Sequence, residues 1–189
     1  MSEDTNYFVH PTAFIEDNVT IGDNTKVWHQ VQIRTGAKIG KNCIFGKSVF
    51  IDTNVSIGNN VKVQNFVSIY QGVTIEDDVF VGPHVCFTND LLPRATNQDW
   101  ELIKTLIKKG ASIGANSTII CGLTVGEHSM IGAGSLVSKD VPSFALVFGN
   151  PAQLNGYVCY CGNIVEKTTS ILPKGTKFSC KKCKKEIIL

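Results

Sequence analysis

The sequence lacks the features by which a chain enters a membrane, binds nucleic acid or is exported. None of its apolar runs approaches the roughly 20 residues that a membrane-spanning helix needs. Its formal net charge is only +2, and Lys and Arg are scattered among acidic residues rather than gathered in a basic stripe. Its first residues are polar and acidic, unlike a secretory signal. We therefore expect a cytoplasmic protein with no nucleic-acid partner and no membrane partner.

What the sequence has instead is an aliphatic or aromatic anchor at every sixth position. A fixed short period predicts a solenoid in which each repeat buries its apolar face by stacking on the next. The repeat breaks once, after Phe87, and resumes at Ile107. The residues in phase are Val9, Ile15, Ile21, Val27, Ile33, Ile39, Phe45, Ile51, Ile57, Val63, Ile69, Ile75, Val81, Phe87, Ile107, Ile113, Ile119, Val125, Ile131 and Val137.

A second apolar or small residue precedes each anchor by two positions, as Val31 precedes Ile33. Two inward positions around one outward position predict a short β-strand. Glycine often follows the anchor, and Asn or Asp often comes two residues later, as in Gly22 and Asn24. Both types tolerate the positive φ of a tight corner. Strand and corner repeated three times predict a triangular coil of about 18 residues.

The break between Phe87 and Ile107 predicts an excursion from the solenoid. The segment 88–106 is longer than one coil allows between these two anchors, so it has to leave the stack. A long excursion from a rigid scaffold is typical of a binding loop. Packing between subunits is the alternative role.

Several motifs occur together along the chain. They are Val27-Trp28-His29, Val63-Gln64-Asn65, Ser68-Ile69-Tyr70, Phe87-Thr88-Asn89-Asp90, Pro93-Arg94, Ile131-Gly132-Ala133-Gly134, Lys139-Asp140-Val141-Pro142 and Gly149-Asn150-Pro151-Ala152. Over residues 8–160 the combination resembles the hexapeptide-repeat N-acetyltransferases that act on nucleotide-linked 3-amino sugars. The resemblance implies an all-β chain: a left-handed parallel β-helix over 1–152 with one protruding loop at 88–106. A small cysteine-rich appendage follows at 153–189.

The resemblance also implies a homotrimer in which acetyl-CoA and the nucleotide sugar meet in clefts between subunits. The Val-Trp-His start and the cysteine-bearing tail are most similar to enzymes that acetylate the C3 amine of UDP-2-acetamido-3-amino-2,3-dideoxyglucuronate for O-antigen synthesis. The segment from Thr88 to Arg94 is closer to enzymes that use dTDP-3-amino-3,6-dideoxyhexoses. The UDP sugar is the main expectation, and the dTDP sugar is the alternative.

Acetyl transfer from a thioester needs a neutral amine, a held thioester and donors for the oxyanion. Asn89 opens the excursion and matches the Thr-Asn step of the family, so the resemblance implies that it orients the amine. Because Asn cannot take a proton, the departing thiolate would receive it. Among the four histidines, His29 carries the family match and is the candidate for a general base.

Small residues after the excursion predict the acetyl-CoA site, because they leave backbone groups open to a pantetheine arm. Lys139 is placed to meet a phosphate, and Pro151 and Ala152 border the adenine end. For the sugar nucleotide, aromatic rings offer stacking faces, amides offer hydrogen bonds, and Arg34 offers a partner for a hexuronate carboxylate. The remaining predicted contacts are Ala115, Ala133 and Gly134 for acetyl-CoA, and Gln64, Asn65, Phe66, Tyr70 and Asp90 for the sugar nucleotide.

The tail carries two close cysteine pairs, Cys159 with Cys161 and Cys180 with Cys183. Seven cysteines without an export signal indicate reduced thiols. Two pairs at this separation predict a structural zinc ribbon with four thiolate ligands, whose metal supplies the folding energy of the tail. A reduced tail without metal, ending in a solvated lysine cluster, is the alternative.

Two rival functions are compatible with this architecture. A γ-class carbonic anhydrase needs three histidines around zinc, two of them spaced as His-x4-His, whereas His84 is followed by Asn89 at that spacing. A non-catalytic scaffold would not need the excursion and would not bind acetyl-CoA.

Overall fold

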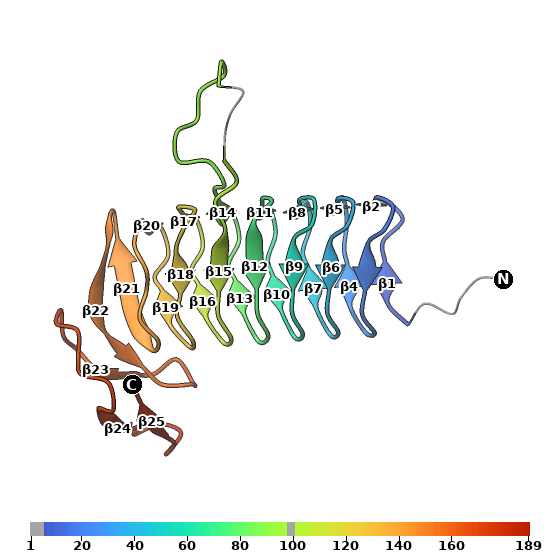
Figure 1. Ribbon diagram of the computed structural model, residues 1–189. Coiled ribbons are helices and arrows are strands. Elements are labelled where there is room, and N and C mark those ends of the chain that lie inside the picture. The colour runs from blue at the N-terminus through green and yellow to red at the C-terminus, as the bar shows by residue number, and fades with distance from the viewer. Residues whose placement is uncertain (1–5, 98–100) are drawn as a thin grey trace.

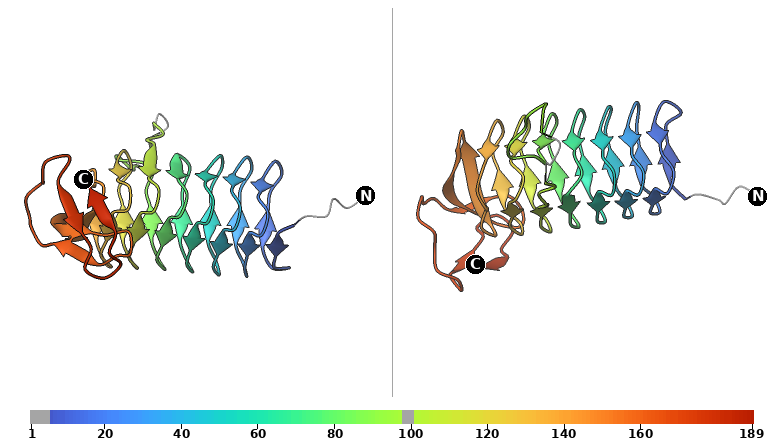
Figure 2. Two further views of the ribbon diagram at one scale, coloured as in Figure 1. Left: turned by 90° about the horizontal axis from the view of Figure 1, so that it is seen from below. Right: turned by 45° about the horizontal axis from the view of Figure 1, so that its top comes forward.

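The computed structural model describes residues 6–97 and 101–189, and β-strands are the only regular secondary structure in that part of the chain. Three sheets, whose strands are parallel throughout the stacked coils, form the faces of a triangular prism (Figure 1, Figure 2). Strands one coil apart pair in register: Val9 pairs with Val27, and Val27 with Phe45. The predicted left-handed parallel β-helix of hexapeptide coils is confirmed. The described residues contain no helix that could span a bilayer.

Each sheet takes one strand from each of the first six coils. The first sheet contains β1 (Phe8–Val9), β4 (Lys26–Val27), β7 (Ile44–Phe45), β10 (Lys62–Val63), β13 (Phe80–Val81), β16 (Ser112–Ile113), β19 (Met130–Ile131), β21 (Ala145–Gly149), β22 (Ala152–Val158) and β23 (Ile164–Glu166). The second contains β2 (Phe14–Ile15), β5 (Gln32–Ile33), β8 (Phe50–Ile51), β11 (Ser68–Ile69), β14 (Cys86–Phe87), β17 (Thr118–Ile119) and β20 (Leu136–Val137). The third contains β3 (Thr20–Ile21), β6 (Lys38–Ile39), β9 (Ser56–Ile57), β12 (Val73–Ile75), β15 (Thr105–Ile107) and β18 (Thr124–Val125). A separate hairpin consists of β24 (Lys177–Ser179) and β25 (Glu186–Ile188).

The turns between these sheets form the three edges of the prism. We call the turns from the first sheet to the second the first corner. The turns from the second sheet to the third are the second corner, and those from the third back to the first are the third corner.

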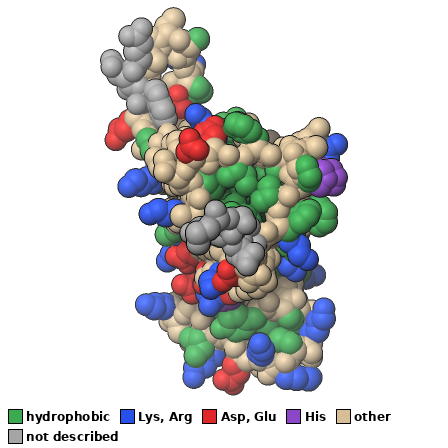
Figure 3. All heavy atoms as spheres, turned by 90° about the vertical axis from the view of Figure 1, so that its right-hand side faces the viewer, with side chains coloured by type: hydrophobic (Ala, Val, Ile, Leu, Met, Phe, Trp, Pro, Cys, Tyr) green, Lys and Arg blue, Asp and Glu red, His purple; other side chains and the backbone are tan. Residues whose placement is uncertain are grey.

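The core of the prism is the stack of predicted anchors. Ile33 and Ile51 are fully buried, and each such side chain contributes about 1.5–3 kcal/mol relative to an exposed one. Val9, Ile15 and Ile21 are only partly buried, because the first coil is stacked on one side only among the described residues. Figure 3 looks onto this end of the prism and shows hydrophobic side chains gathered on it.

The corners confirm one sequence prediction and correct another. Corner residues such as Asn54 and Asp78 have φ values of 56° and 61°, as expected. Gly22 and Gly40, which follow anchors, do not have positive φ, so the prediction for this glycine position is wrong. A Cβ on Gly40 would lie 2.5 Å from the carbonyl oxygen of Gly58 in the next coil. Glycine is required there because neighbouring coils approach too closely for a side chain.

The excursion leaves the prism at the second corner, between β14 and β15, and projects away from the column (Figure 1). Both of its stems are fixed to the next coil. The hydroxyl of Thr88 accepts a hydrogen bond from the N–H of Cys121 (3.0 Å), and that of Thr105 from the N–H of Gly122 (3.2 Å). β15 begins at Thr105, inside the predicted segment 88–106. Residues 98–100 of the excursion and residues 1–5 of the acidic N-terminal segment lie outside the described residues.

The tail continues the first sheet. β21 is parallel to β19, and β22 and β23 add antiparallel strands beside it. Because β22 begins at Ala152, this strand crosses the predicted boundary between residues 152 and 153. Tyr157 of β22 is buried, and its hydroxyl accepts a hydrogen bond from the N–H of Leu172 (3.0 Å).

Candidate active site

Most of the predicted residues for the sugar nucleotide and acetyl-CoA lie on two different corners of the prism. The second corner holds Arg34, Tyr70, Asn89, Asp90 and Lys139, and the first corner holds His29, Gln64, Asn65, Phe66, Ala115, Ala133 and Gly134. The two corners are the opposite edges of the second sheet. About six residues of extended chain separate them within one coil, which is on the order of 15–20 Å. Within one chain the predicted site residues therefore form two separate groups, which we call the predicted half-sites, rather than one closed pocket.

Asn89 is the residue at which the chain leaves the prism. Its neighbour Thr88 is anchored to the next coil through Cys121, so the starting point of Asn89 is fixed. Asn89 is half-buried. The carboxylate of Asp90 accepts a hydrogen bond from the N–H of Leu92 (2.8 Å) and shapes the first turn of the excursion. The hydrogen bond of Thr88 therefore fixes the backbone at Asn89, where the projecting loop begins.

Arg34 is held between two carboxylates of the same corner. Its Nη1 lies 3.0 Å from Asp52 Oδ1, and its Nε lies 3.5 Å from Glu16 Oε1. Asp52 is buried, and its other oxygen accepts a hydrogen bond from the N–H of Gln71 (3.2 Å). The charge of the guanidinium is thus compensated within the chain. This pairing weakens the attraction of Arg34 for a substrate carboxylate.

Two predicted aromatic rings are exposed, one on each corner. Phe66, on the first corner, is 45% exposed and stacks on His84 with ring centroids 5.0 Å apart. Tyr70, on the second corner, meets the ring of Phe50 edge-on at 5.7 Å. His84 is not among the predicted site residues, because the sequence places it at a corner where an outward polar side chain is ordinary. The structure puts it in the same coil as Asn89.

The two predicted amide side chains of the first corner are Asn65 and Gln64. The side-chain oxygen of Asn65 accepts a hydrogen bond from the N–H of Lys47 (2.8 Å), so it already takes part in coil stacking. Gln64 is half-buried beside it.

His29 does not meet Asn89 within the chain. It lies three coils away, which is about 14 Å along the prism axis at the usual strand spacing, and on the other corner. Its ring stacks on His10 with centroids 3.6 Å apart. With Thr12, Gln30 and Lys47 it lines an open surface cavity of about 320 Å³.

The predicted acetyl-CoA contacts lie in the last coils and in the turn between β21 and β22. The N–H of Gly134 donates to the carbonyl of Ala115 (2.7 Å), which places the small residues of adjacent coils side by side. Ala133 and Pro151 are exposed.

Lys139 and Ala152 line the same cavity of about 140 Å³ at the end of the prism. The structure therefore brings together these two predicted contacts, although they come from the second corner and from β22. The cavity continues to Ile171 of the tail.

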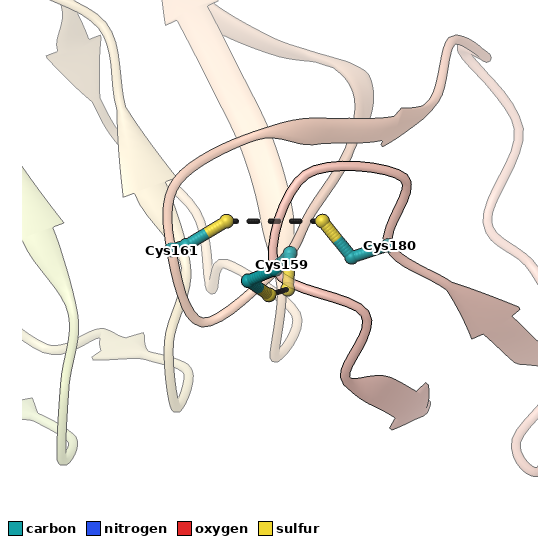
Figure 4. A group of neighbouring side chains, drawn as sticks. Cys159, Cys161 and Cys180 are labelled. Carbon is teal, nitrogen blue, oxygen red and sulfur yellow. Dashed lines mark hydrogen bonds between the residues drawn. The ribbon is translucent and has the colours of Figure 1, made fainter.

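The four tail cysteines come together as the sequence predicts. Their sulfur atoms all lie within 4.8 Å of one another. Figure 4 shows the side chains of Cys161 and Cys180 pointing toward each other. Burial raises the pKa of Cys159 to about 12, whereas hydrogen bonds from backbone N–H groups lower the pKa of Cys180 to about 6. Among the described residues this is the one cluster of side chains with the donor set of a metal centre.

Comparison with known families places the hexapeptide coils in a characterised group. The model described as bacterial transferase hexapeptide (six repeats) matches residues 18–53, 54–89 and 104–139. The model described as hexapeptide repeat of succinyl-transferase matches residues 36–71. The gap between the matches at 89 and 104 coincides with the excursion.

A curated relative is similar over most of the chain. It is dTDP-3-amino-3,6-dideoxy-alpha-D-galactopyranose 3-N-acetyltransferase from Aneurinibacillus thermoaerophilus, which is 50% identical over 154 residues, 82% of this chain and 80% of the relative.

Two solved structures share the fold. PerB from Caulobacter crescentus, in complex with CoA and GDP-perosamine, has a TM-score of 0.52 at 21% identity. The match covers 80% of this chain but only 58% of PerB. The hexapeptide-repeat acetyltransferase VCA0836 from Vibrio cholerae, complexed with acetyl coenzyme A, has a TM-score of 0.50 at 27% identity. That match covers 65% of this chain and 70% of the other.

Proposed function

We propose that this chain, which belongs to the bacterial transferase hexapeptide family, transfers the acetyl group of acetyl-CoA to the amino group of a nucleotide-linked amino sugar. The observation that carries the proposal is the 50% identity with a sugar-nucleotide N-acetyltransferase across the coils and the excursion. The acetyl-CoA complex of the similar Vibrio cholerae acetyltransferase supports the donor. The product is used for surface polysaccharide synthesis, as the family resemblance implies.

The substrate we propose is a dTDP-3-amino-3,6-dideoxyhexose. The relative from Aneurinibacillus acts on such a sugar, and the segment from Thr88 to Arg94 also favours it. The structure adds a chemical reason. A 6-deoxy sugar has no carboxylate to bind, and Arg34 is already paired with Glu16 and Asp52. These observations favour the dTDP sugar over the UDP-linked glucuronate derivative.

In the proposed reaction the sugar amine attacks the thioester carbonyl, the C–N bond forms and the C–S bond breaks. An amine flanked by oxygen substituents titrates near an α-amine, about 8, so roughly a tenth to a fifth is neutral at neutral pH. Asn89 holds the neutral amine in line with the carbonyl through its side-chain oxygen. The proton of the amine ends on the departing thiolate of coenzyme A, so no general base is required.

We also propose that the working form is a homotrimer with shared sites. Asn89 and Tyr70 lie on the second corner, whereas Phe66, Ala115 and Ala133 lie on the first. A neighbouring subunit that sets its first corner beside this second corner would unite the two half-sites. Sugar and acetyl-CoA would then meet in a cleft that neither chain forms alone.

The experiment that tests the function measures thiol release from acetyl-CoA with different acceptors side by side. We expect kcat/KM for a dTDP-3-amino-3,6-dideoxyhexose to exceed that for UDP-2-acetamido-3-amino-2,3-dideoxyglucuronate by at least about tenfold. The dTDP-hexose without the amino group is the control and should give no thiol. Faster reaction with the glucuronate would overturn the substrate, and no thiol release with either sugar would overturn the function.

A further inference from the structure

We propose that Cys159, Cys161, Cys180 and Cys183 hold one Zn²⁺ ion, and that the tail folded around this ion is the C-terminal cap of the β-helix. The proposal rests on the tail alone and is independent of the acetyltransferase chemistry.

The spacing of the four sulfur atoms fits a tetrahedral zinc shell. The Sγ atoms of Cys159 and Cys183 are 3.3 Å apart, and those of Cys161 and Cys180 are 3.7 Å apart. Four sulfurs at about 2.3 Å from a central zinc would be about 3.8 Å from one another. A disulfide requires about 2.05 Å. The cluster is therefore close to the size of a Zn(Cys)₄ centre and too open for two disulfides.

The backbone around the ligands supports bound thiolates. The N–H of Cys159 donates to the carbonyl of Asn163 (2.9 Å), and the N–H of Cys180 donates to the carbonyl of Lys185 (2.9 Å). These backbone bonds fix the position of one ligand residue in each pair. Each pair lies in a tight turn: the N–H of Gly162 donates to the carbonyl of Cys159 (2.7 Å), and the N–H of Lys184 donates to the carbonyl of Cys180 (2.9 Å).

The charges around the cluster also suit a thiolate centre. Four thiolates around one Zn²⁺ leave two negative charges. Four lysines adjoin the second pair in sequence and supply positive charge to this part of the chain: Lys181, Lys182, Lys184 and Lys185.

The metal would add a link between two parts of the tail that already pack together, because Phe178 stacks on Tyr157 with ring centroids 6.5 Å apart and Ile187 is buried. Cys159 and Cys161 directly follow β22, whereas Cys180 and Cys183 lie between β24 and β25. A hairpin of only two strands is marginal by itself. The zinc ion therefore ties the β24–β25 hairpin to the last strands of the first sheet.

The tied tail covers the end of the prism. Tyr160, between two ligands, packs edge-on against His128 (4.7 Å) and Phe144 (5.1 Å) of the third corner. Ile171 closes one side of the end cavity that Lys139 and Ala152 also line. Solenoids need such terminal units because their last repeat has no neighbour on which to stack.

Metal analysis of the full chain, purified without chelator under reducing conditions, tests the site. We expect about one zinc per chain. Cys161→Ser should retain less than about a tenth of it, and Cys86→Ser, which removes a thiol outside the cluster, should retain all of it. Replacement by Co²⁺ should give the absorption of tetrahedral thiolate coordination, which Cys161→Ser would lose. Iron instead of zinc, free thiols without metal, or disulfides between these cysteines would overturn the site.

A strong chelator tests the capping role. Removing zinc from the native chain should lower the thermal midpoint by at least about 5 °C, and added zinc should restore it. A second measurement is hydrogen exchange, which should increase in β19, β21 and β22 and not in β4 or β7. Loss of zinc with no change in exchange of β21 would show that the ion folds only the hairpin and would overturn the cap.

Discussion

Some corner residues other than glycine have a strained, left-handed backbone conformation. Two of them are phenylalanines, and the contacts that offset the strain differ between the two. Phe66 and Phe144 both have φ of 59°, which costs a residue with a Cβ about 1–2 kcal/mol. Phe144 is buried, and packing of its ring offsets the cost. Phe66 is 45% exposed, and its ring contacts are with His84 and with the ammonium group of Lys47, which lies 5.9 Å from the ring centroid. A strained aromatic residue kept on the surface favours a role in binding, as proposed for the sugar nucleotide.

Asn89 is the residue whose replacement tests the mechanism. Asn89→Ala should lower kcat by at least about tenfold, because the amine would no longer be held in line with the thioester. The measurement is steady-state thiol release, with the oligomeric state checked by light scattering.

The matched control for Asn89→Ala removes an amide far from the excursion. Asn18 lies at a corner of the first coil with φ of 58°, which glycine adopts freely, so Asn18→Gly should leave kcat unchanged. Unchanged turnover in Asn89→Ala, with the assembly intact, would dismiss the assignment.

At the scale of the coils, glycine after the anchor sets how closely neighbouring turns can stack. Gly40→Ala would place a methyl group 2.5 Å from the carbonyl oxygen of Gly58 and force the two coils apart. We expect a loss of about 2 kcal/mol, seen as a fall of about 4–8 °C in the thermal midpoint.

Gly175→Ala is the comparison for Gly40→Ala. Gly175 has φ of 91°, but a Cβ there would meet no atom within 4 Å. This variant should therefore lose only the cost of the backbone conformation, about 1–2 kcal/mol or less. If Gly40→Ala lost no more than Gly175→Ala, close approach would not be the reason for the glycine column.

At the scale of the whole molecule, the two half-sites predict complementation between subunits. Asn89→Ala should inactivate the predicted half-site on the second corner, and Phe66→Ala should inactivate the one on the first corner. Co-expressed in equal amounts, the two variants should form mixed trimers with about a quarter of the sites intact, because each site would take one corner from each of two chains. Activity is compared with that of each variant expressed alone.

The complementation experiment separates a shared site from a site within one chain. If both corners of a site came from the same chain, every subunit would carry one defect and mixing would restore nothing. A monomer by light scattering would also contradict the shared site.

Much of the prism and part of the site could be predicted from the sequence. The six-residue period located the buried anchors, and Asn or Asp marked corners with positive φ, because both signals depend on neighbours within one coil. The spacing of the two cysteine pairs also predicted the cluster of Cys159, Cys161, Cys180 and Cys183, because it is typical of four ligands of one metal ion.

The pairing of Arg34 could not be predicted in this way. Its partners, Glu16 and Asp52, lie one coil away on either side, and only the register of the stack puts the three side chains in contact.

The periodic sequence by itself determined a triangular β-helix with an excursion at Asn89, because burial of one residue in six is a local rule that every coil repeats. Only the tertiary structure decided that the predicted half-sites occupy opposite edges of one face, that glycine serves close approach, and that the tail extends the first sheet. These features depend on contacts between coils, which arise only when the turns are stacked.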